Sequence, residues 1–303
     1  MNNLVQKLGE YLLADNMCAS MSALGCVLLG FVLPVGFIAS LVLGLITLQK
    51  GYKASLSVLS FILLPAIALA ITQHFGFFYR FDLLLAQCGL MFVLALILRH
   101  TVSWKRVLES ASLIGILLVS LIHLVFPNIR KIWVELIKGY FLTNDWMLTF
   151  HLDTNHSAEI IRSLATIATG SFVFFVLFGI IVLLVLARWW QTALFFPGRF
   201  RLEFTEIRMD QTSAMLLIIV TIGLFWQSSW LEDIYPTLLL PFMIGGLSLL
   251  HRLAINRKEM LLLIITIYIA LLLLTFFTTV VLAIVGLMDS FCNFRKRYVL
   301  FQN

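Results

Sequence analysis

Long apolar stretches recur along the whole length of this chain. A stretch of 18 or more apolar residues can cross a hydrocarbon core of about 30 Å. Hydrophobic residues make up 61% of the 303 residues and charged residues 12%, whereas a soluble domain has about a quarter charged residues. The sequence therefore predicts a single all-α membrane domain over 1–303, with eight or nine transmembrane helices. The predicted spans are 17–33, 37–48, 54–75, 82–98, 107–126, 160–188, 211–230, 234–250 and 260–288.

Two of these regions allow alternative helix counts. Pro34 interrupts the first apolar region, which forms either one kinked helix or, as we favour, two short helices. The last stretch, 260–288, would make a helix of about 45 Å. It predicts either one crossing or a hairpin that bends near Thr275 to Thr279. The two alternatives place the C-terminus on opposite sides of the membrane.

The basic residues predict the orientation. Cations in cytoplasmic loops outnumber those in external loops, so the richer side is predicted to be internal and the segment 127–159 external. The net charge of +6 comes from clusters between apolar runs, which argues against a nucleic-acid-binding face. The predicted inner side holds Lys50, Lys53, Arg99, Lys105, Arg106, Arg188, Arg199, Arg201, Arg208, Arg252, Arg257 and Lys258, and the outer side holds Arg80, Arg130, Lys131, Lys138 and Arg162.

Two connecting segments have an amphipathic character. In residues 129–141, apolar side chains recur at helical spacing and charged ones fall on the opposite side, which predicts a helix lying in the outer interface. In residues 188–210, aromatic side chains alternate with charges of both signs, which predicts a segment on the inner head-group surface. This inner loop is either a connector anchored in lipid or a docking surface for a cytoplasmic partner.

Three short sequences carry a family resemblance: Pro197-Gly198-Arg199-Phe200 with Glu203-Phe204, the run from Gly245 to His251, and Gly286 to Phe291 followed by Phe294-Arg295-Lys296-Arg297. Together they resemble the YybS family of bacterial inner-membrane proteins. Members of that family are similar to the substrate-binding S components of energy-coupling-factor transporters. The chain departs from the family pattern at Arg199, where a second glycine is usual.

The resemblance implies an S-component-like core and an energising partner subunit. In S components an Ala-x-x-x-Ala stripe on the first helix contacts that subunit, so Ala19 and Ala23 are the corresponding positions here. The motif residues themselves favour structural roles. Pro197 and Gly198 would form a sharp turn, and Asp289 would cap a following turn or pair with Arg295 or Arg297.

Polar residues within spans are functional candidates because burying them unpaired is costly. By the predicted orientation, these side chains lie toward the outer leaflet, where a shallow pocket could capture a small polar or aromatic solute. The alternative is that they form interhelical hydrogen bonds and an aromatic belt. The predicted ligand-binding residues are Gln87, His123, Trp226, Gln227 and Trp230.

No catalytic, metal or cofactor site is predicted. The outer-loop run from His151 to His156 offers imidazole and carboxylate groups, but its spacing does not fix three strong ligands around one metal. The sequence also has no nucleophile elbow and no phosphate-binding loop.

The sequence therefore predicts a multi-pass protein of the bacterial inner membrane that binds or moves a small solute and depends on a partner for energy. The alternative is a non-transporting scaffold that recruits a cytoplasmic or envelope partner. The predicted partner-binding residues are Ala19 and Ala23, toward an energising subunit, and, in the inner loop and C-terminal segment of the scaffold, Pro197, Gly198, Phe200, Phe204, Arg295 and Arg297.

Overall fold

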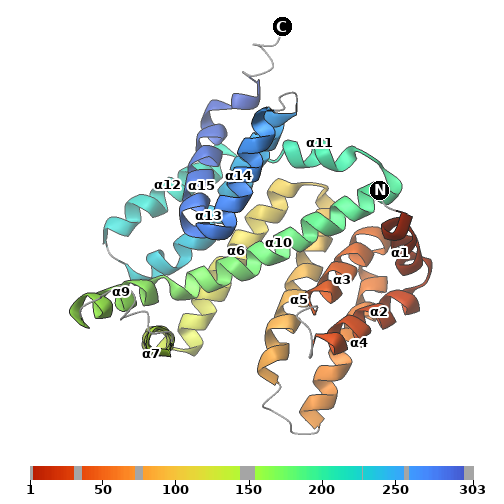
Figure 1. Cartoon of the computed structure of the whole chain (residues 1–303), viewed down its shortest axis with the longest axis horizontal. Coiled ribbons are helices and arrows are strands. Elements are labelled where there is room, and N and C mark those ends of the chain that lie inside the picture. The colour runs from red at the N-terminus through yellow and green to blue at the C-terminus, as the bar shows by residue number, and fades with distance from the viewer. Residues whose placement is uncertain are drawn as a thin grey trace. The chain divides into compact units, whose positions relative to one another are not determined.

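The chain folds into helices throughout the part that the structure describes. The computed structural model (Figure 1) describes residues 3–30, 36–71, 78–143, 154–226, 228–255 and 259–296, and in these ranges it contains no strand. The helices form two compact units. The first comprises residues 1–107 and 178–204, and the second comprises 108–177 and 205–303.

The first unit has an apolar core between its N-terminal helices. Helix α2 packs against α3 and α4, and α3 packs against α5. Fully buried side chains such as Ala19, Leu43 and Ile46 fill the space between them. The helices of this unit are α1 (Asn3–Ala14), α2 (Asn16–Leu29), α3 (Phe37–Lys50), α4 (Tyr52–Ile71), α5 (Phe78–Thr101), the second half of α10 (Ala168–Phe195) and α11 (Arg199–Thr205).

The first apolar region forms two helices, α2 and α3, rather than one long helix. Pro34, at which the sequence predicts the break, lies outside the described residues. Helix α1 precedes α2 at a bend of 116°, so the chain enters this region through a short helix that turns sharply into the first apolar one.

Two glycines adopt backbone angles that other residues rarely adopt. Gly51 has φ +89° in the turn between α3 and α4, where Arg99 donates hydrogen bonds of 2.5 Å to Leu48 O and 3.3 Å to Thr47 O. The guanidinium thus caps the end of α3 at Leu48 O, while Thr47 O also accepts from the backbone N–H of Gly51 at 3.1 Å. Gly198 has φ +86°, so the turn predicted at Pro197-Gly198 does use the positive dihedral that glycine permits.

The second unit is built around one buried helix, α13 (Ser229–Ala254). Every residue from Thr237 to Leu249 is buried, so α13 is covered on all sides and its few polar groups must find partners inside the protein. The helices around it are α6 (Trp104–Val125), α7 (Ile129–Thr143), α9 (Thr154–Thr166), the first half of α10, α12 (Gln211–Gly223), α14 (Glu259–Leu273) and α15 (Thr275–Cys292), with a short 3-10 helix at Leu224–Trp226.

Helices α13 and α15 lie side by side and run in the same direction (Figure 1). Pro236 and Leu239 line a cavity together with Thr275 and Thr279, and further along both helices Gly246 meets Gly286. Since α14 leaves the end of α13 and α15 returns parallel to it, the last apolar stretch forms a hairpin. The break falls at Leu274, next to the predicted bend.

The crossing of α13 and α15 requires glycine on both helices. A Cβ atom on Gly246 would lie 2.1 Å from Leu282 O, and one on Gly286 would lie 2.0 Å from Phe242 O. Both neighbours are backbone atoms, which cannot move without separating the helices. The small-residue face predicted at residues 245–248 is therefore a contact between helices of one unit, made through Gly246.

Several helices are long and apolar enough to cross a membrane. Within the described residues five qualify: Leu83–Thr101, Trp104–Val125, Ala168–Phe195, Ser229–Ala254 and Thr275–Cys292. The bent pair α1 and α2 would make a sixth. The predicted eight or nine spans are not confirmed, because apolar helices such as α3 and α14 are short. At 1.5 Å per residue, the 14 residues of α3 extend about 21 Å, less than the hydrocarbon core.

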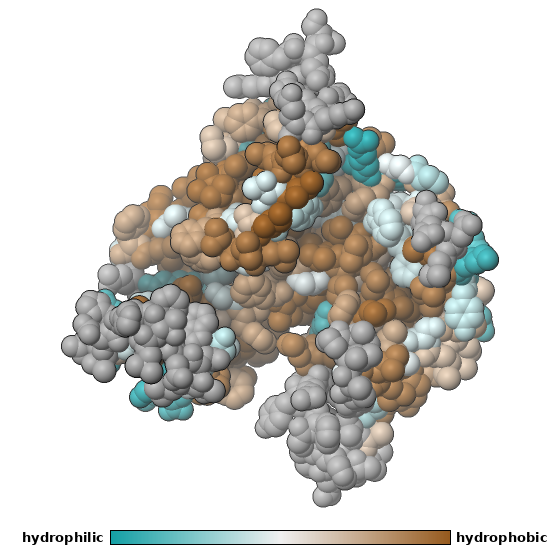
Figure 2. All heavy atoms as spheres, in the orientation of Figure 1, coloured by the Kyte–Doolittle hydropathy of each residue, from teal (hydrophilic) through white to brown (hydrophobic). Residues whose placement is uncertain are grey.

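Large apolar side chains remain exposed on the spanning helices. In the second unit, Leu124 of α6 is 78% exposed and Phe277 of α15 is 70% exposed. Hydrophobic residues dominate the visible surface of the described chain (Figure 2). A soluble monomer rarely exposes apolar surface on this scale, whereas lipid-facing helices do so by necessity. The length and the exposed surface of the helices therefore define a helical membrane protein.

Candidate functional site

A fully buried carboxylate, that of Asp233 in α13, forms one polar centre of the second unit. Its side chain is 0% exposed. His123 Nε2 of α6 lies 2.7 Å from Asp233 Oδ2, and the backbone N–H of Gly170 in α10 donates to Oδ1 at 3.1 Å. We call His123, Gly170 and Asp233 the Asp233 cluster. It joins three helices through both oxygens of one carboxylate.

Local sequence explains how the Asp233 cluster forms. Asp233 lies in the first turns of α13, where the helix dipole favours negative charge. The backbone of α10 approaches it very closely, because a Cβ atom on Gly170 would lie 1.5 Å from Asp233 O. Glycine at this position therefore allows α10 to reach the carboxylate.

Further hydrogen bonds tie the neighbouring helices together at the same end of the unit. Trp133 of α7 donates from Nε1 to Thr169 Oγ1 at 3.0 Å, and Trp230 donates from Nε1 to Ser120 Oγ at 3.2 Å. Arg130 donates to Ser229 O at 3.3 Å. Helix α7, which covers the amphipathic segment predicted at 129–141, is thus held against α10 and α13 by polar contacts.

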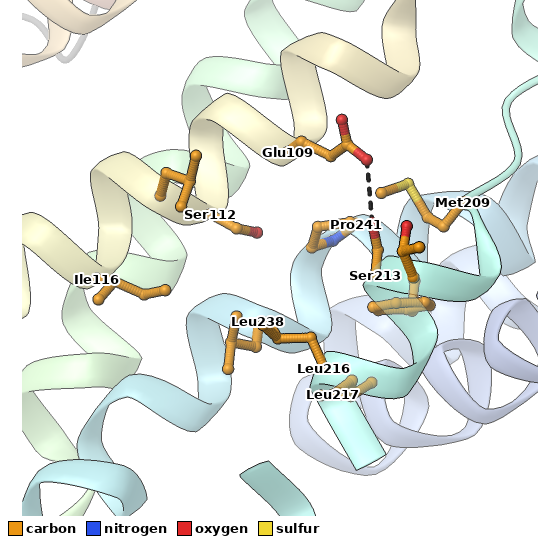
Figure 3. Close-up of a pocket in the computed structure, with 12 residues that line it drawn as sticks. Glu109, Ser112, Ile116, Met209, Ser213, Leu216, Leu217, Leu238 and Pro241 are labelled. Carbon is orange, nitrogen blue, oxygen red and sulfur yellow. Dashed lines mark hydrogen bonds between the residues drawn. The ribbon is translucent and has the colours of Figure 1, made fainter. Parts of the chain in front are cut away.

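A cavity of about 350 Å³ lies between α6, α12 and α13 (Figure 3). In it, Ser213 Oγ of α12 donates a hydrogen bond of 3.0 Å to Glu109 Oε1 of α6. Ser112 Oγ donates to Thr237 O at 3.1 Å. We call this the Glu109 cavity. Its other lining residues are mostly apolar: Leu113, Ile116, Met209, Thr212, Leu216, Leu217, Leu238, Pro241 and Phe242.

The polar side chains of α6 form one stripe along the helix. Glu109, Ser112, Ser120 and His123 follow one another at spacings of three, eight and three residues, which places them on one helix face. Three of them contact α13: Ser112 at Thr237, Ser120 at Trp230 and His123 at Asp233. From Ser112 to His123 the stripe therefore faces the buried helix along about 16 Å.

A second cavity, of about 420 Å³, lies between α9, α10, α13 and α15. Its polar lining comes from hydroxyls such as Ser171, Thr275 and Thr279, and no charged residue is among its described lining residues. Such a space suits an acyl chain or another apolar group. Because none of its described lining residues is charged, this cavity offers fewer specific contacts to a polar solute than the Glu109 cavity does.

An ion-pair cluster closes the opposite end of α13 and α15. Arg295 Nε lies 2.9 Å from Asp289 Oδ2, and the backbone N–H of Phe294 donates to Asp289 Oδ1 at 3.0 Å. Asp289 thus performs both predicted roles, capping the following turn and pairing with Arg295. Arg208 donates to Asp289 O and Ser290 O at 2.9 and 2.8 Å.

Arg295 is the centre of this ion-pair cluster. Its guanidinium also donates to Thr205 O, Ile207 O and Ser248 Oγ. Burial lowers the pKa of Arg295, the attraction of Asp289 opposes that shift, and the positive charges of Arg208 and Arg252 add to it. The segment 205–208 and the C-terminal turn are therefore fixed to α13 by one side chain.

The structure divides the predicted ligand-binding residues. Gln87 belongs to the first unit, whereas His123, Trp226 and Trp230 belong to the second, and Gln227 lies outside the described residues. Trp226 is 77% exposed. None of the described four lines the Glu109 cavity. A pocket made by these residues stays a prediction.

The predicted partner-binding residues have different environments. Ala19 and Ala23 are buried inside the first unit, so a partner could reach them only after α2 moved. Pro197 and Gly198 are exposed. Phe200 stacks on the buried Phe204 at 5.7 Å between ring centroids. Arg295 is held in the ion-pair cluster, and Arg297 lies outside the described residues.

Asp233 and Glu109 were not among the residues predicted from the sequence, although each had a signal. Glu109 falls inside the predicted span 107–126, three residues before Ser112. Asp233 stands one residue before the predicted span 234–250. An acidic residue at that position is typical of a loop that precedes a transmembrane helix. Helix α13 begins at Ser229, so the carboxylate lies inside the helix.

No group of three or more His, Cys, Asp or Glu side chains that could hold a metal ion occurs within the described ranges. His151 and Asp153 of the predicted outer loop lie outside those ranges. Comparison of the chain with known protein families, curated proteins and solved structures gave no match.

Proposed function

We propose that the protein is a membrane subunit that binds a small solute in the Glu109 cavity. The composition of that cavity carries the proposal. Small-molecule sites have volumes of about 300–1,000 Å³ and apolar walls with a few placed polar groups. The cavity of about 350 Å³, with the Glu109 carboxylate bonded to Ser213 and the rest of its wall mostly apolar, has this pattern.

The charge of the cavity favours a particular solute chemistry. Glu109 is the only charged residue among the described residues that line it. An ammonium group or another hydrogen-bond donor would complement the carboxylate, and the hydroxyls of Thr212 and Ser213 would accept or donate further bonds. The body of the solute would pack on apolar side chains such as Leu217 and Phe242.

The proposal includes a dependence on other proteins. Because the sequence has no phosphate-binding loop, energy for transport would come from a partner subunit, as the resemblance to S components implies. The basic side of the chain would face the cytoplasm of a bacterial cell, with the protein in the inner membrane.

A cavity-filling substitution tests the proposal. Leu113 lines the cavity and is 62% exposed, so Leu113→Trp adds volume at the opening without overpacking the core. We expect the amount of small molecule that copurifies with the protein, measured by mass spectrometry, to fall about tenfold or more, which corresponds to about 1.4 kcal/mol.

Leu117→Trp is the matched control, since Leu117 lies one turn further along α6, is 68% exposed and does not line the cavity. It should retain as much solute as the unmodified protein. Equal retention by both variants, or no solute in the unmodified protein after mild extraction, would refute the proposal.

The scaffold remains a second candidate because the segment around the Pro197-Gly198 turn exposes large apolar side chains. Phe196 is 55% exposed and Leu202 is 58% exposed. A photocrosslinker at Leu202 distinguishes the two functions. A solute-binding subunit should give lipid adducts or an energising subunit, whereas a scaffold should give one specific cytoplasmic or envelope protein.

A further inference from the structure

Three arginines lie near one another where α13 and α15 end: Arg295 pairs with the Asp289 carboxylate, Arg208 donates to the backbone at Asp289 and Ser290, and the charges of Arg208 and Arg252 both act on Arg295. Gly245, Ser248 and Arg252 follow one another at spacings of three and four residues, so they share a face of α13. Arg295 lies on that face, 3.2 Å from Ser248 Oγ and 3.5 Å from Gly245 O. Arg252 is the next residue along it. Arg208 donates to the end of α15, at Asp289 O and Ser290 O.

The three arginines differ in how their donors are used. Arg295 bonds to Asp289, to three backbone carbonyls and to Ser248, and its side chain is 11% exposed. All three of its nitrogens donate within the protein. Arg208 uses Nε and Nη2 on the end of α15, which leaves Nη1. Arg252 is half-buried and makes none of the contacts that hold Arg295.

The cluster carries an excess of positive charge. Three arginines against Asp289 leave two charges, and the C-terminal ends of α13 and α15 supply about half a negative charge each. About one positive charge is left. The charges of Arg208 and Arg252 lower the pKa of Arg295, although less than its burial does. Glu206 and Asp210, which flank Arg208 along the chain, are exposed, so water and salt screen them.

Exposed apolar side chains adjoin this charge. Met288 is 50% exposed and Phe291 is 39% exposed, on either side of Asp289 and Ser290 in α15. A ligand that bears one phosphate charge next to hydrocarbon would satisfy both features. Basic sites between transmembrane helices near the cytoplasmic surface bind the head groups of anionic lipids.

We propose that Arg252 and Arg208 bind the phosphate of one anionic phospholipid, whose acyl chains lie along α15 over Met288 and Phe291. The site is separate from the Glu109 cavity and does not depend on a solute there. The bound lipid neutralises the positive charge of the arginines that Asp289 and the helix ends do not balance. It thereby stabilises the C-terminal turn that Arg295 holds in place.

Arg252→Gln tests this proposal. Native mass spectrometry of the protein extracted from bilayers that contain phosphatidylglycerol and phosphatidylcholine should show about one retained phosphatidylglycerol. Arg252→Gln should weaken that retention about fivefold, the effect of one cation near an anionic surface. Arg106→Gln removes an exposed charge from the first turn of α6 and should leave retention unchanged.

Added inorganic phosphate distinguishes a lipid from a free anion. The proposal expects millimolar phosphate to leave the bound lipid in place, because phosphate lacks the acyl chains. Retention of phosphatidylglycerol by Arg252→Gln at the level of the unmodified protein would overturn the proposal. Equal retention of phosphatidylcholine, or displacement of the lipid by phosphate alone, would overturn it as well.

Discussion

Replacing Gly286 with alanine should destabilise the second unit by about 3 kcal/mol, the upper end of the usual cost of overpacking. The added methyl group would lie 2.0 Å from Phe242 O. A carbonyl oxygen of a packed helix cannot rotate away as a side chain can, so α15 would have to move off α13. Gly246→Ala should have a similar effect, because its methyl group would lie 2.1 Å from Leu282 O.

Gly245→Ala provides the matched control for this prediction. It makes the same chemical change one residue away on α13, where a Cβ atom would have no other atom within 4 Å. Unfolding in mixed micelles should therefore change little for Gly245→Ala and occur at lower denaturant for Gly246→Ala and Gly286→Ala. If all three variants unfolded alike, the close crossing of α13 and α15 would be wrong.

Asp233→Ala should also destabilise the second unit by about 3 kcal/mol, as expected when one partner of a buried polar pair is removed. The substitution leaves His123 and the backbone N–H of Gly170 without the carboxylate that they share. Water cannot easily replace it, because the Asp233 side chain is 0% exposed. Unfolding in mixed micelles measures the loss directly.

The neighbouring residue provides the control for Asp233. Glu232 is 29% exposed and lies 3.9 Å from Arg130, an arrangement that contributes at most about 1 kcal/mol at a surface. Glu232→Ala should therefore be nearly neutral. The double variant His123→Ala with Asp233→Ala should lose less stability than the two single losses combined, since both remove the same interaction. Strict additivity would show that the pair does not interact.

Much of the helical architecture could be predicted because it depends on local pattern. Apolar runs and helical spacing indicate where α2, α3, α6, α10 and α13 lie, and α7 covers a segment predicted from its apolar and charged faces. The number of helices that cross the membrane could not be predicted in the same way. An apolar run shows that a helix is buried in lipid or protein, but its length decides whether it spans, and α3 and α14 are shorter than the hydrocarbon core.

The candidate site was harder to predict because it depends on which helices meet. His123 could be singled out as a polar residue in a span, but its partner lies 110 positions later in the sequence. Glu109 and Ser213 are 104 positions apart. The pairing of Asp289 with Arg295 could be predicted, since the two residues lie six positions apart and share one helix end.

The most direct test of the central claim is an experimental density map of the protein purified in nanodiscs without added ligand. Compact density that is not protein is expected in the cavity between α6, α12 and α13, within hydrogen-bonding distance of Glu109 and Ser213. An acyl chain as the sole occupant, or closure of the cavity by its own side chains, would contradict the claim that this protein binds a polar solute there.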